Sequence, residues 1–187
     1  MRVISGSAGG LRLLVPKSEL RPSMDKVRAA IFSSLGDFVQ DSLVLDLFAG
    51  SGAYGIEALS RGAAKSVFVD TDAASENVIE KNLQMTHLKD VGRFIKQDVH
   101  TFLKHSPITQ EKYDLIIADP PYKKQKDDRD HITELLTNVE WQKWLQPHGI
   151  LILEMGKNLD FHPYPTWEIV RDRNYGKSRV TFLRQNH

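Results

Sequence analysis

The sequence predicts an α/β protein in which a mostly parallel sheet is covered by helices on both faces. From about residue 43 onward, short apolar runs alternate with helical patterns, and only short segments connect them. A glycine-rich stretch follows the first apolar run, and acidic residues stand at or near the ends of four of these runs. Ligands of such folds lie beyond the carboxyl ends of the strands, so these residues mark the expected binding edge. They are Asp46, Asp70, Asp98 and Asp119.

The composition is that of a single globular domain. The 187 residues are 41% hydrophobic and 26% charged, and the net charge of +1 means that any nucleic-acid surface must be local. The chain has no cysteine, which excludes disulfides and thiolate metal sites, and its histidines show no metal-ligand spacing, so we expect no metal. Neither a membrane-spanning run nor a secretion signal is present, and we therefore expect a cytoplasmic protein without a membrane partner.

The first half of the α/β region contains three predicted strands and two helices. The apolar run 42–48 reads as a buried strand, and the glycine loop after it leads into a helix that ends near Gly62. Residues 65–70 form the second strand. Residues 74–88 have the spacing of a helix, and residues 93–98 form the third strand.

The second half continues the alternation and ends in a hairpin. A short helix is expected around Phe102, followed by a strand at 113–119. Residues 132–145 predict one helix, stopped by Pro147 and Gly149, and 149–155 a fifth strand. The tail, residues 166–184, reads as two strands around a turn at Asn174-Tyr175-Gly176.

Residues 1–40 form an extension that we treat as part of the same domain as residues 41–187. The runs 2–5 and 11–15, with a glycine pair between them, suggest a β-hairpin, and residues 23–35 a helix with Ser23 as its N-cap. Basic residues outnumber acidic ones here, which is compatible either with a solvated face or with a surface that binds the phosphates of a nucleic acid. They are Arg2, Arg12, Lys17, Arg21, Lys26 and Arg28.

The glycine loop has the spacing of a dinucleotide site, with Gly50, Gly52 and Gly55 in the pattern G-x-G-x-x-G. However, Asp46 lies four residues before the first glycine, and a carboxylate about 5 Å from a pyrophosphate would cost roughly 3 kcal/mol at an effective dielectric near 20. S-adenosylmethionine has no phosphate and carries a sulfonium and an ammonium group, so an acid beside the loop attracts it. The charge therefore favours S-adenosylmethionine as the cofactor.

The next two acidic strand ends fit the adenosine part of that cofactor. Asp70 is placed to accept hydrogen bonds from the ribose hydroxyls, a feature shared with NAD sites. Asp98 could accept from the adenine amino group while the Val99 N–H meets a ring nitrogen. Asp98 is equally well placed as a helix N-cap, and the two roles are compatible.

The motif Asp119-Pro120-Pro121-Tyr122 closes the fourth strand and suggests chemistry on an exocyclic amine. Two prolines cannot donate to a sheet ladder, so the chain leaves the sheet here with a stiff backbone. The Asp119 carboxylate and the Pro120 carbonyl could each accept one N–H of an amine, which aims its lone pair at a methyl donor. Tyr122 could stack on a base flipped out of its helix.

Together these segments resemble a known family. The glycine loop and the Asp-Pro-Pro-Tyr motif are similar to those of class I methyltransferases that act on exocyclic amines. With "RVISG" and "RPSMDKVRAAIFSSL", they resemble the RsmD family over nearly the whole chain. That family methylates the N2 of a guanine in small-subunit (16S) ribosomal RNA with S-adenosylmethionine. The resemblance implies a Rossmann-like, seven-stranded sheet whose last strand is antiparallel.

The resemblance also implies roles for individual residues. The catalytic motif falls on Asp119, Pro120, Pro121 and Tyr122. Cofactor contacts fall on Asp46, Phe48, Gly50, Gly52, Asp70, Asp98 and Val99, and phosphates of the RNA are expected at Arg2, Arg12, Arg21 and Arg28. The expected partner is small-subunit RNA or a partly assembled small subunit, bound by a monomer. Lys123, Lys124, Lys126 and Arg129 could close over the nucleotide or form a solvated loop.

Other functions remain compatible with these residues. Adenine-N6 methylation of DNA also uses an Asp-Pro-Pro-Tyr motif, although the chain has no separate domain for reading duplex sequence. Glutamine-N5 methylation of a protein would be expected to show Asn in place of Asp119. A non-catalytic RNA-binding or ribosome-assembly protein could retain the same fold. Trp141 and Trp144, three residues apart, are interpreted as core residues and not as a base-stacking platform.

Overall fold

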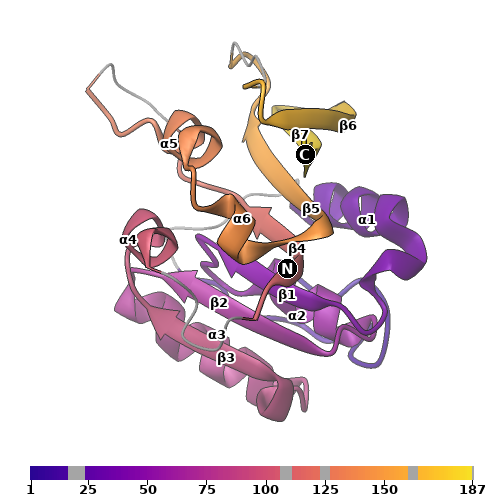
Figure 1. Cartoon of the computed structure of the whole chain (residues 1–187). Coiled ribbons are helices and arrows are strands. Elements are labelled where there is room, and N and C mark those ends of the chain that lie inside the picture. The colour runs from indigo at the N-terminus through magenta and orange to yellow at the C-terminus, as the bar shows by residue number, and fades with distance from the viewer. Residues whose placement is uncertain (17–23, 106–110, 123–126, 160–163, 187) are drawn as a thin grey trace.

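The computed structural model describes residues 1–16, 24–105, 111–122, 127–159 and 164–186 of the chain (Figure 1). In this part of the chain one seven-stranded sheet forms the centre of the molecule, in the order β3-β2-β1-β4-β5-β7-β6. β7 pairs antiparallel with both of its neighbours, and the other pairs are parallel. In order across the sheet, the strands are β3 (Gly92–Lys96), β2 (Lys65–Asp70), β1 (Leu43–Leu47), β4 (Tyr113–Ala118), β5 (Leu145–Gly156), β7 (Ser178–Gln185) and β6 (Trp167–Tyr175). The predicted Rossmann-like fold with an antiparallel last strand is confirmed.

Helices cover both faces of this sheet, as the alternating strands and helices predict. Alternate residues of each central strand enter two separate hydrophobic cores, Val44 and Ile117 in one and Leu45 and Ile116 in the other. The first core is shared with α1 (Met24–Leu35), α2 (Ala53–Ser60) and α3 (Ala73–Met85), and the second with α4 (Val99–Lys104), α5 (His131–Thr137) and α6 (Trp141–Trp144). Two short 3-10 helices, η1 (Gly36–Val39) and η2 (Lys89–Val91), follow α1 and α3. Among the described helices, none is long and apolar enough to cross a membrane.

The predicted N-terminal hairpin is reduced to a single bridge. Arg2 and Arg12 form an isolated antiparallel bridge, and the Val3 N–H donates to the Leu11 carbonyl (2.9 Å). The segment is anchored by its apolar side chains, since Val3 and Leu13 are buried in the same core as α1 and α2. α1 begins at Met24, and its predicted N-cap, Ser23, lies outside the described residues.

The single helix predicted over residues 132–145 is wrong, because the structure divides it into α5 and α6. Asn138 adopts an extended conformation at the end of α5, and its side chain accepts from the Glu140 N–H (3.0 Å). The chain can then turn Trp141 inward, where its indole donates to the Leu135 carbonyl (2.6 Å). Pro147 does not stop a helix. It lies in β5, where the register with β4 shifts.

The tail hairpin is confirmed, and its turn begins at Gly176, two residues after the predicted start at Asn174. Asn174 and Tyr175 already pair with Arg179 and Ser178, so Gly176 and Lys177 alone make the turn. Gly176 has φ +61°, the left-handed conformation that such two-residue turns favour. Trp141 and Trp144 are 1% and 2% exposed, which confirms that they are core residues.

A buried carboxylate fastens the N-terminal segment to the helices behind the sheet. Glu57 of α2 is fully buried, and its oxygens accept from the backbone N–H groups of Ile4 (2.7 Å) and Ser5 (3.2 Å). The Arg61 guanidinium donates to Oε1 (2.7 Å), and Nε of Arg28, from α1, lies 3.6 Å from Oε2. One carboxylate therefore joins the first strand-like segment, α1 and α2.

We expect Glu57→Gln to lower the free energy of unfolding by about 3 kcal/mol, because the buried Arg28 guanidinium loses a charged partner. Equilibrium unfolding in urea measures the change. Glu168→Gln is the matched control at an exposed position of β6, and it should alter stability by less than about 0.5 kcal/mol. Equal effects of the two substitutions would contradict a structural role for Glu57.

Candidate active site

The candidate site lies at the switch in strand order between β1 and β4. β2 and β3 extend the sheet on one side of β1, while β4 and β5 extend it on the other (Figure 1). Leu47 pairs with Ala118, so the segments that follow β1 and β4 leave the sheet side by side. In open α/β sheets such a switch creates the crevice in which ligands bind. The structure therefore brings the glycine loop next to Asp119–Tyr122.

The glycine loop is held in an unusual backbone conformation. Phe48 (φ +58°), Gly50 (φ +52°) and Gly52 (φ +74°) are all left-handed, which is easy for glycine and strained for phenylalanine. The Phe48 ring packs edge-on against His131, with 5.0 Å between ring centroids. At Gly55, an added Cβ would lie 2.3 Å from the Phe68 ring, so this glycine lets α2 approach β2.

Two of the predicted carboxylates hold this loop by its backbone. Asp46 is 2% exposed, and its Oδ2 accepts from the Gly55 N–H (2.9 Å) at the start of α2. Asp70 accepts from the Gly50 N–H (2.8 Å) at Oδ2 and from the Asp72 N–H (2.9 Å) at Oδ1. A carboxylate has about four lone-pair sites, so Asp70 can hold the loop and still accept from a ligand. Asp46 therefore lies against the backbone at the start of α2, beside the loop as predicted from the sequence.

Asp98 caps α4, as one of the two predicted roles requires. Its Oδ1 accepts from the N–H (2.9 Å) and the hydroxyl (3.0 Å) of Thr101, while Oδ2 is 3.1 Å from Nη1 of Arg129. Burial alone would raise the pKa of Asp98, but the Thr101 hydrogen bonds and the Arg129 charge outweigh it and hold the pKa below its usual value. Val99, the first residue of α4, is 2% exposed.

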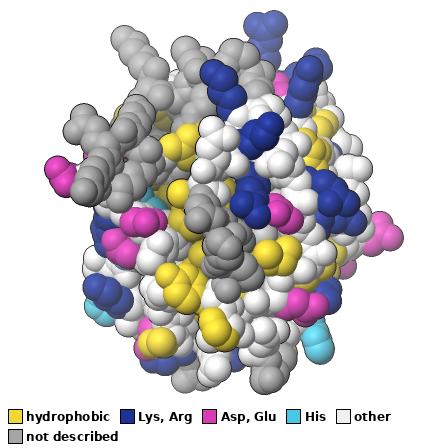
Figure 2. Space-filling model, turned by 90° about the horizontal axis from the view of Figure 1, so that it is seen from above, with side chains coloured by type: hydrophobic (Ala, Val, Ile, Leu, Met, Phe, Trp, Pro, Cys, Tyr) yellow, Lys and Arg dark blue, Asp and Glu magenta, His cyan; other side chains and the backbone are white. Residues whose placement is uncertain are grey.

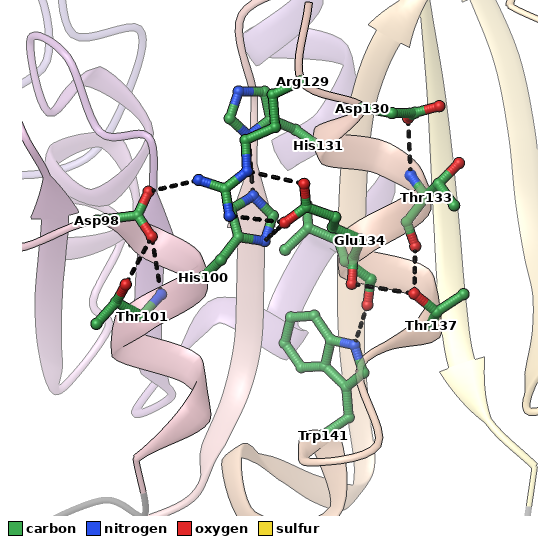
Figure 3. Close-up of polar contacts among 11 residues, drawn as sticks. Asp98, His100, Thr101, Arg129, Asp130, His131, Thr133, Glu134, Thr137 and Trp141 are labelled. Carbon is green, nitrogen blue, oxygen red and sulfur yellow. Dashed lines mark hydrogen bonds and ion pairs between the residues drawn. The ribbon is translucent and has the colours of Figure 1, made fainter.

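Arg129 connects the Asp98 cap with α5, a link that the sequence did not indicate. Its guanidinium lies between Asp98 and Glu134, with Nη2 at 2.7 Å from Glu134 Oε2 (Figure 3). The hydrogen bond from Arg129 lowers the pKa of Glu134. Arg129 is thus engaged in ion pairs with Asp98 and Glu134 at the edge of the cavity.

Two histidines that are 31 residues apart meet inside this network. Nε2 of His100 lies 2.8 Å from Nδ1 of His131, and both rings lie beside Arg129 (Figure 3). Burial is the main cause that lowers the pKa of each imidazole, and the nearby guanidinium adds to it. No spacing rule in the sequence links the pair. In the described residues, no group of three or more His, Cys, Asp or Glu side chains could hold a metal ion.

Pro120, Pro121 and Tyr122 of the Asp-Pro-Pro-Tyr motif border a cavity of about 630 Å³. Pro120 is buried and Pro121 exposed, so the chain turns from the sheet edge to the surface within two residues. The Tyr122 hydroxyl lies 3.1 Å from the Ser178 hydroxyl and 3.4 Å from Glu154 Oε1. These contacts fix the ring at the wall of the cavity, which also includes residues of α5 and of the β6–β7 turn.

Glu154 also lines this cavity, and no sequence pattern predicted it as a site residue. It is 3% exposed, at the end of the apolar part of β5, and its Oε2 accepts from the Tyr54 hydroxyl (2.5 Å). Burial raises the pKa of Tyr54 well above its usual value, and the negative charges of Glu154 and Asp119 raise it further. The sequence feature that could have indicated this role is the position of Glu154, the one charged residue in the apolar run 149–155.

The four arginines predicted to bind RNA have different surroundings. Arg2 and Arg12 are exposed at the N-terminal bridge. Arg28 is only 1% exposed and lies 3.0 Å from Asp25 and 3.6 Å from Glu57, so it cannot reach a phosphate and its predicted role is wrong. Arg21 lies outside the described residues, as do Lys123, Lys124 and Lys126.

Comparison with known proteins identifies relatives along the whole chain. The sequence model of the family described as Conserved hypothetical protein 95 matches residues 1–184. The chain is 34% identical to YlbH of Bacillus subtilis (strain 168) over 99% of both proteins. It is 33% identical to Ribosomal RNA small subunit methyltransferase D of Haemophilus influenzae, over 94% of this chain and 89% of that protein.

The solved structure of yhhF from Escherichia coli has the same architecture. Its TM-score is 0.85 at 28% identity, and the match covers 100% of this chain and 98% of that one. The switch-point site therefore lies on a fold that the relatives share from end to end. The chain belongs to the Conserved hypothetical protein 95 family, which is the RsmD family of class I methyltransferases.

Proposed function

We propose that this protein transfers a methyl group from S-adenosylmethionine to the exocyclic N2 of a guanine in small-subunit ribosomal RNA. The observation that carries the proposal is the placement of Asp119 and Pro120 directly beside the glycine loop, at the β1–β4 switch point. The family relatives named for small-subunit ribosomal RNA methylation support the choice of substrate. We expect a cytoplasmic monomer that acts on the RNA or on a partly assembled subunit.

The residues around the glycine loop fit S-adenosylmethionine. Asp46 and Asp70 give this edge negative charge, which suits a cationic ligand and opposes a pyrophosphate. Asp70 would hold the ribose hydroxyls, and Asp98 with Val99 the adenine ring. When bound, S-adenosylmethionine supplies a methyl group made electrophilic by its sulfonium.

The chain itself would orient the acceptor amine. The Asp119 carboxylate and the Pro120 carbonyl each accept one N–H of the guanine amine, so the nitrogen lone pair turns out of the ring plane. Tyr122, held through its hydroxyl by Ser178, gives the flipped base a surface on which to stack. As the new N–C bond forms, the amine proton becomes acidic and leaves to Asp119 or to water.

Basic residues around the site would position the RNA through its phosphates. Figure 2 shows several Lys and Arg side chains gathered over one side of the upper face, close to exposed hydrophobic side chains. Lys157 and Lys177 border the cavity, and Arg2 and Arg12 are exposed on the N-terminal segment. Such contacts supply affinity without reading the sequence.

Asp119→Ala should reduce methyl transfer at least about 100-fold, because the amine loses an acceptor that orients it. The assay transfers labelled methyl groups to small-subunit RNA that lacks the modification, and nucleoside analysis identifies the product as N2-methylguanosine. Cofactor affinity should stay within about threefold of the original. The control Asp90→Ala, at an exposed position in η2, should leave the rate unchanged. Product on adenine, or an undiminished rate for Asp119→Ala, would refute the assignment.

Asp70→Asn should weaken S-adenosylmethionine binding about 10- to 100-fold, since hydrogen bonds to a charged acceptor are worth roughly 1.5–3 kcal/mol. Isothermal titration calorimetry measures the affinity. Asp72→Asn is the neighbouring control, because Asp72 caps α3 through the Ala74 N–H (2.8 Å) and has no proposed ligand role. Tight binding of NADH without binding of S-adenosylmethionine would overturn the cofactor assignment.

Arg12→Gln should weaken binding of small-subunit RNA and reduce the dependence of log affinity on log salt by about one unit. Filter binding between low and physiological salt gives both values. Arg93→Gln, at the amino end of β3 and thus away from the ligand edge, is the control and should leave the slope unchanged. Equal slopes for the parent protein and Arg12→Gln would remove Arg12 from the RNA surface.

A further inference from the structure

The cavity that Pro120, Pro121 and Tyr122 border contains a buried carboxylate, Glu154, and its position is set by the sheet. β4 and β5 are parallel, with Ala118 paired to Leu153. Asp119 directly follows β4 and Glu154 is the next residue of β5, so continuing this register places them opposite one another, and neighbouring strands are about 4.7–4.9 Å apart. Side chains at paired positions point to the same face. The two acidic groups therefore stand side by side at the carboxyl end of the sheet.

The hydrogen bonds of Glu154 leave one of its oxygens available toward the cavity. Oε2 accepts from the Tyr54 hydroxyl at 2.5 Å. For Oε1, the described residues provide one long contact, the Tyr122 hydroxyl at 3.4 Å, which is beyond the usual range for such bonds. The raised pKa of Tyr54 keeps its hydroxyl protonated, so it remains a donor that fixes Oε2. Buried carboxylate oxygens normally accept hydrogen bonds, so a donor group of a ligand would find a favourable acceptor in Oε1.

Two adjacent carboxylates can accept hydrogen bonds from the Watson–Crick edge of guanine, whereas the same edge of adenine places an acceptor against one of them. Guanine presents two neighbouring donors on this edge, the N1–H and the N2 amine. Adenine also presents an amine, but its N1 is an acceptor and would face a carboxylate oxygen without a proton between them. A site that must hydrogen-bond a donor rejects a ligand that lacks it, because the buried acceptor is left unpaired.

We propose that Glu154 accepts the guanine N1–H through Oε1 and is the residue that restricts this enzyme to guanine. The inference rests on the proposed function, in which Asp119 and Pro120 hold the neighbouring N2 amine. The two carboxylates then have different roles. Asp119 orients the N2 amine that reacts, and Glu154 accepts a hydrogen bond from the neighbouring N1–H, which guanine has and adenine lacks. Tyr54 acts as a positioning residue, since it fixes the other oxygen of Glu154.

The test compares guanine with 2-aminopurine at the methylated position of small-subunit RNA, after that position has been mapped with the parent protein. 2-Aminopurine keeps the amine at C2 but has an N1 acceptor in place of N1–H. The parent protein should prefer guanine by at least about 100-fold in kcat/KM. Glu154→Gln should narrow this preference to within about tenfold, because the amide can accept from guanine N1–H or donate to N1 of 2-aminopurine.

A merely structural role for Glu154 gives a different result. Loss of folding or of Tyr122 positioning would lower the rates on both substrates together and leave the preference unchanged, which would overturn the inference. Glu168→Gln is the matched control, since it makes the same change at an exposed position of β6 outside the cavity, and it should keep the full preference for guanine. If the parent protein forms no N2-methylguanosine, the proposed function itself fails. If it does, and Glu154→Gln retains the full preference, only the role of Glu154 fails.

Discussion

The parallel pairing of β1 with β4 is the constraint on which the site depends. β1 lies between β2 and β4, so the chain must leave β1 and β4 in different directions at the same edge. The glycine loop and the Asp-Pro-Pro-Tyr segment become neighbours through this geometry, although about 70 residues separate them in the sequence. This adjacency would bring a cofactor bound at the glycine loop within reach of a base bound at the Asp-Pro-Pro-Tyr segment.

Carboxylates hold backbone segments in place around this edge of the sheet. Asp46 and Asp70 hold the glycine loop through backbone N–H groups, and Glu57 holds the N-terminal segment in the same way. Glu154 is held by the Tyr54 hydroxyl, while its contact with the Tyr122 hydroxyl is long. Asp70 and Glu154 accept from neutral backbone and hydroxyl donors, so the site favours ligands that bring positive charge or hydrogen-bond donors. A sulfonium cofactor and the donor edge of guanine both meet this requirement.

Local patterns predicted the fold well because strand and helix periods are properties of short segments. The run 65–70 coincides with β2, and the spacing of 74–88 identified α3 to within a few residues. The helix predicted over 132–145 was wrong because the packing of Trp141 beneath α5 decides where the chain breaks, and that contact is not visible in periodicity. Asp70, Asp98 and Asp119 could be identified as site candidates because each stands at the end of an apolar run in the sequence. The burial of Arg28 and the contact between His100 and His131 depend on how distant segments pack, so no local pattern of residues indicates them.

The position of β7 has a consequence for how the protein is made. This strand is encoded last among the seven, yet it lies between β5 and β6 and supplies Val180, Phe182 and Leu183 to the two cores. During synthesis β6 emerges first and has no strand to pair with until residues 178–185 have left the ribosome. β7 and β6, two of the seven strands, thus join the sheet only after residues 178–185 have been made, and a nascent chain that stalls earlier exposes the edge of β5 to aggregation or to chaperones.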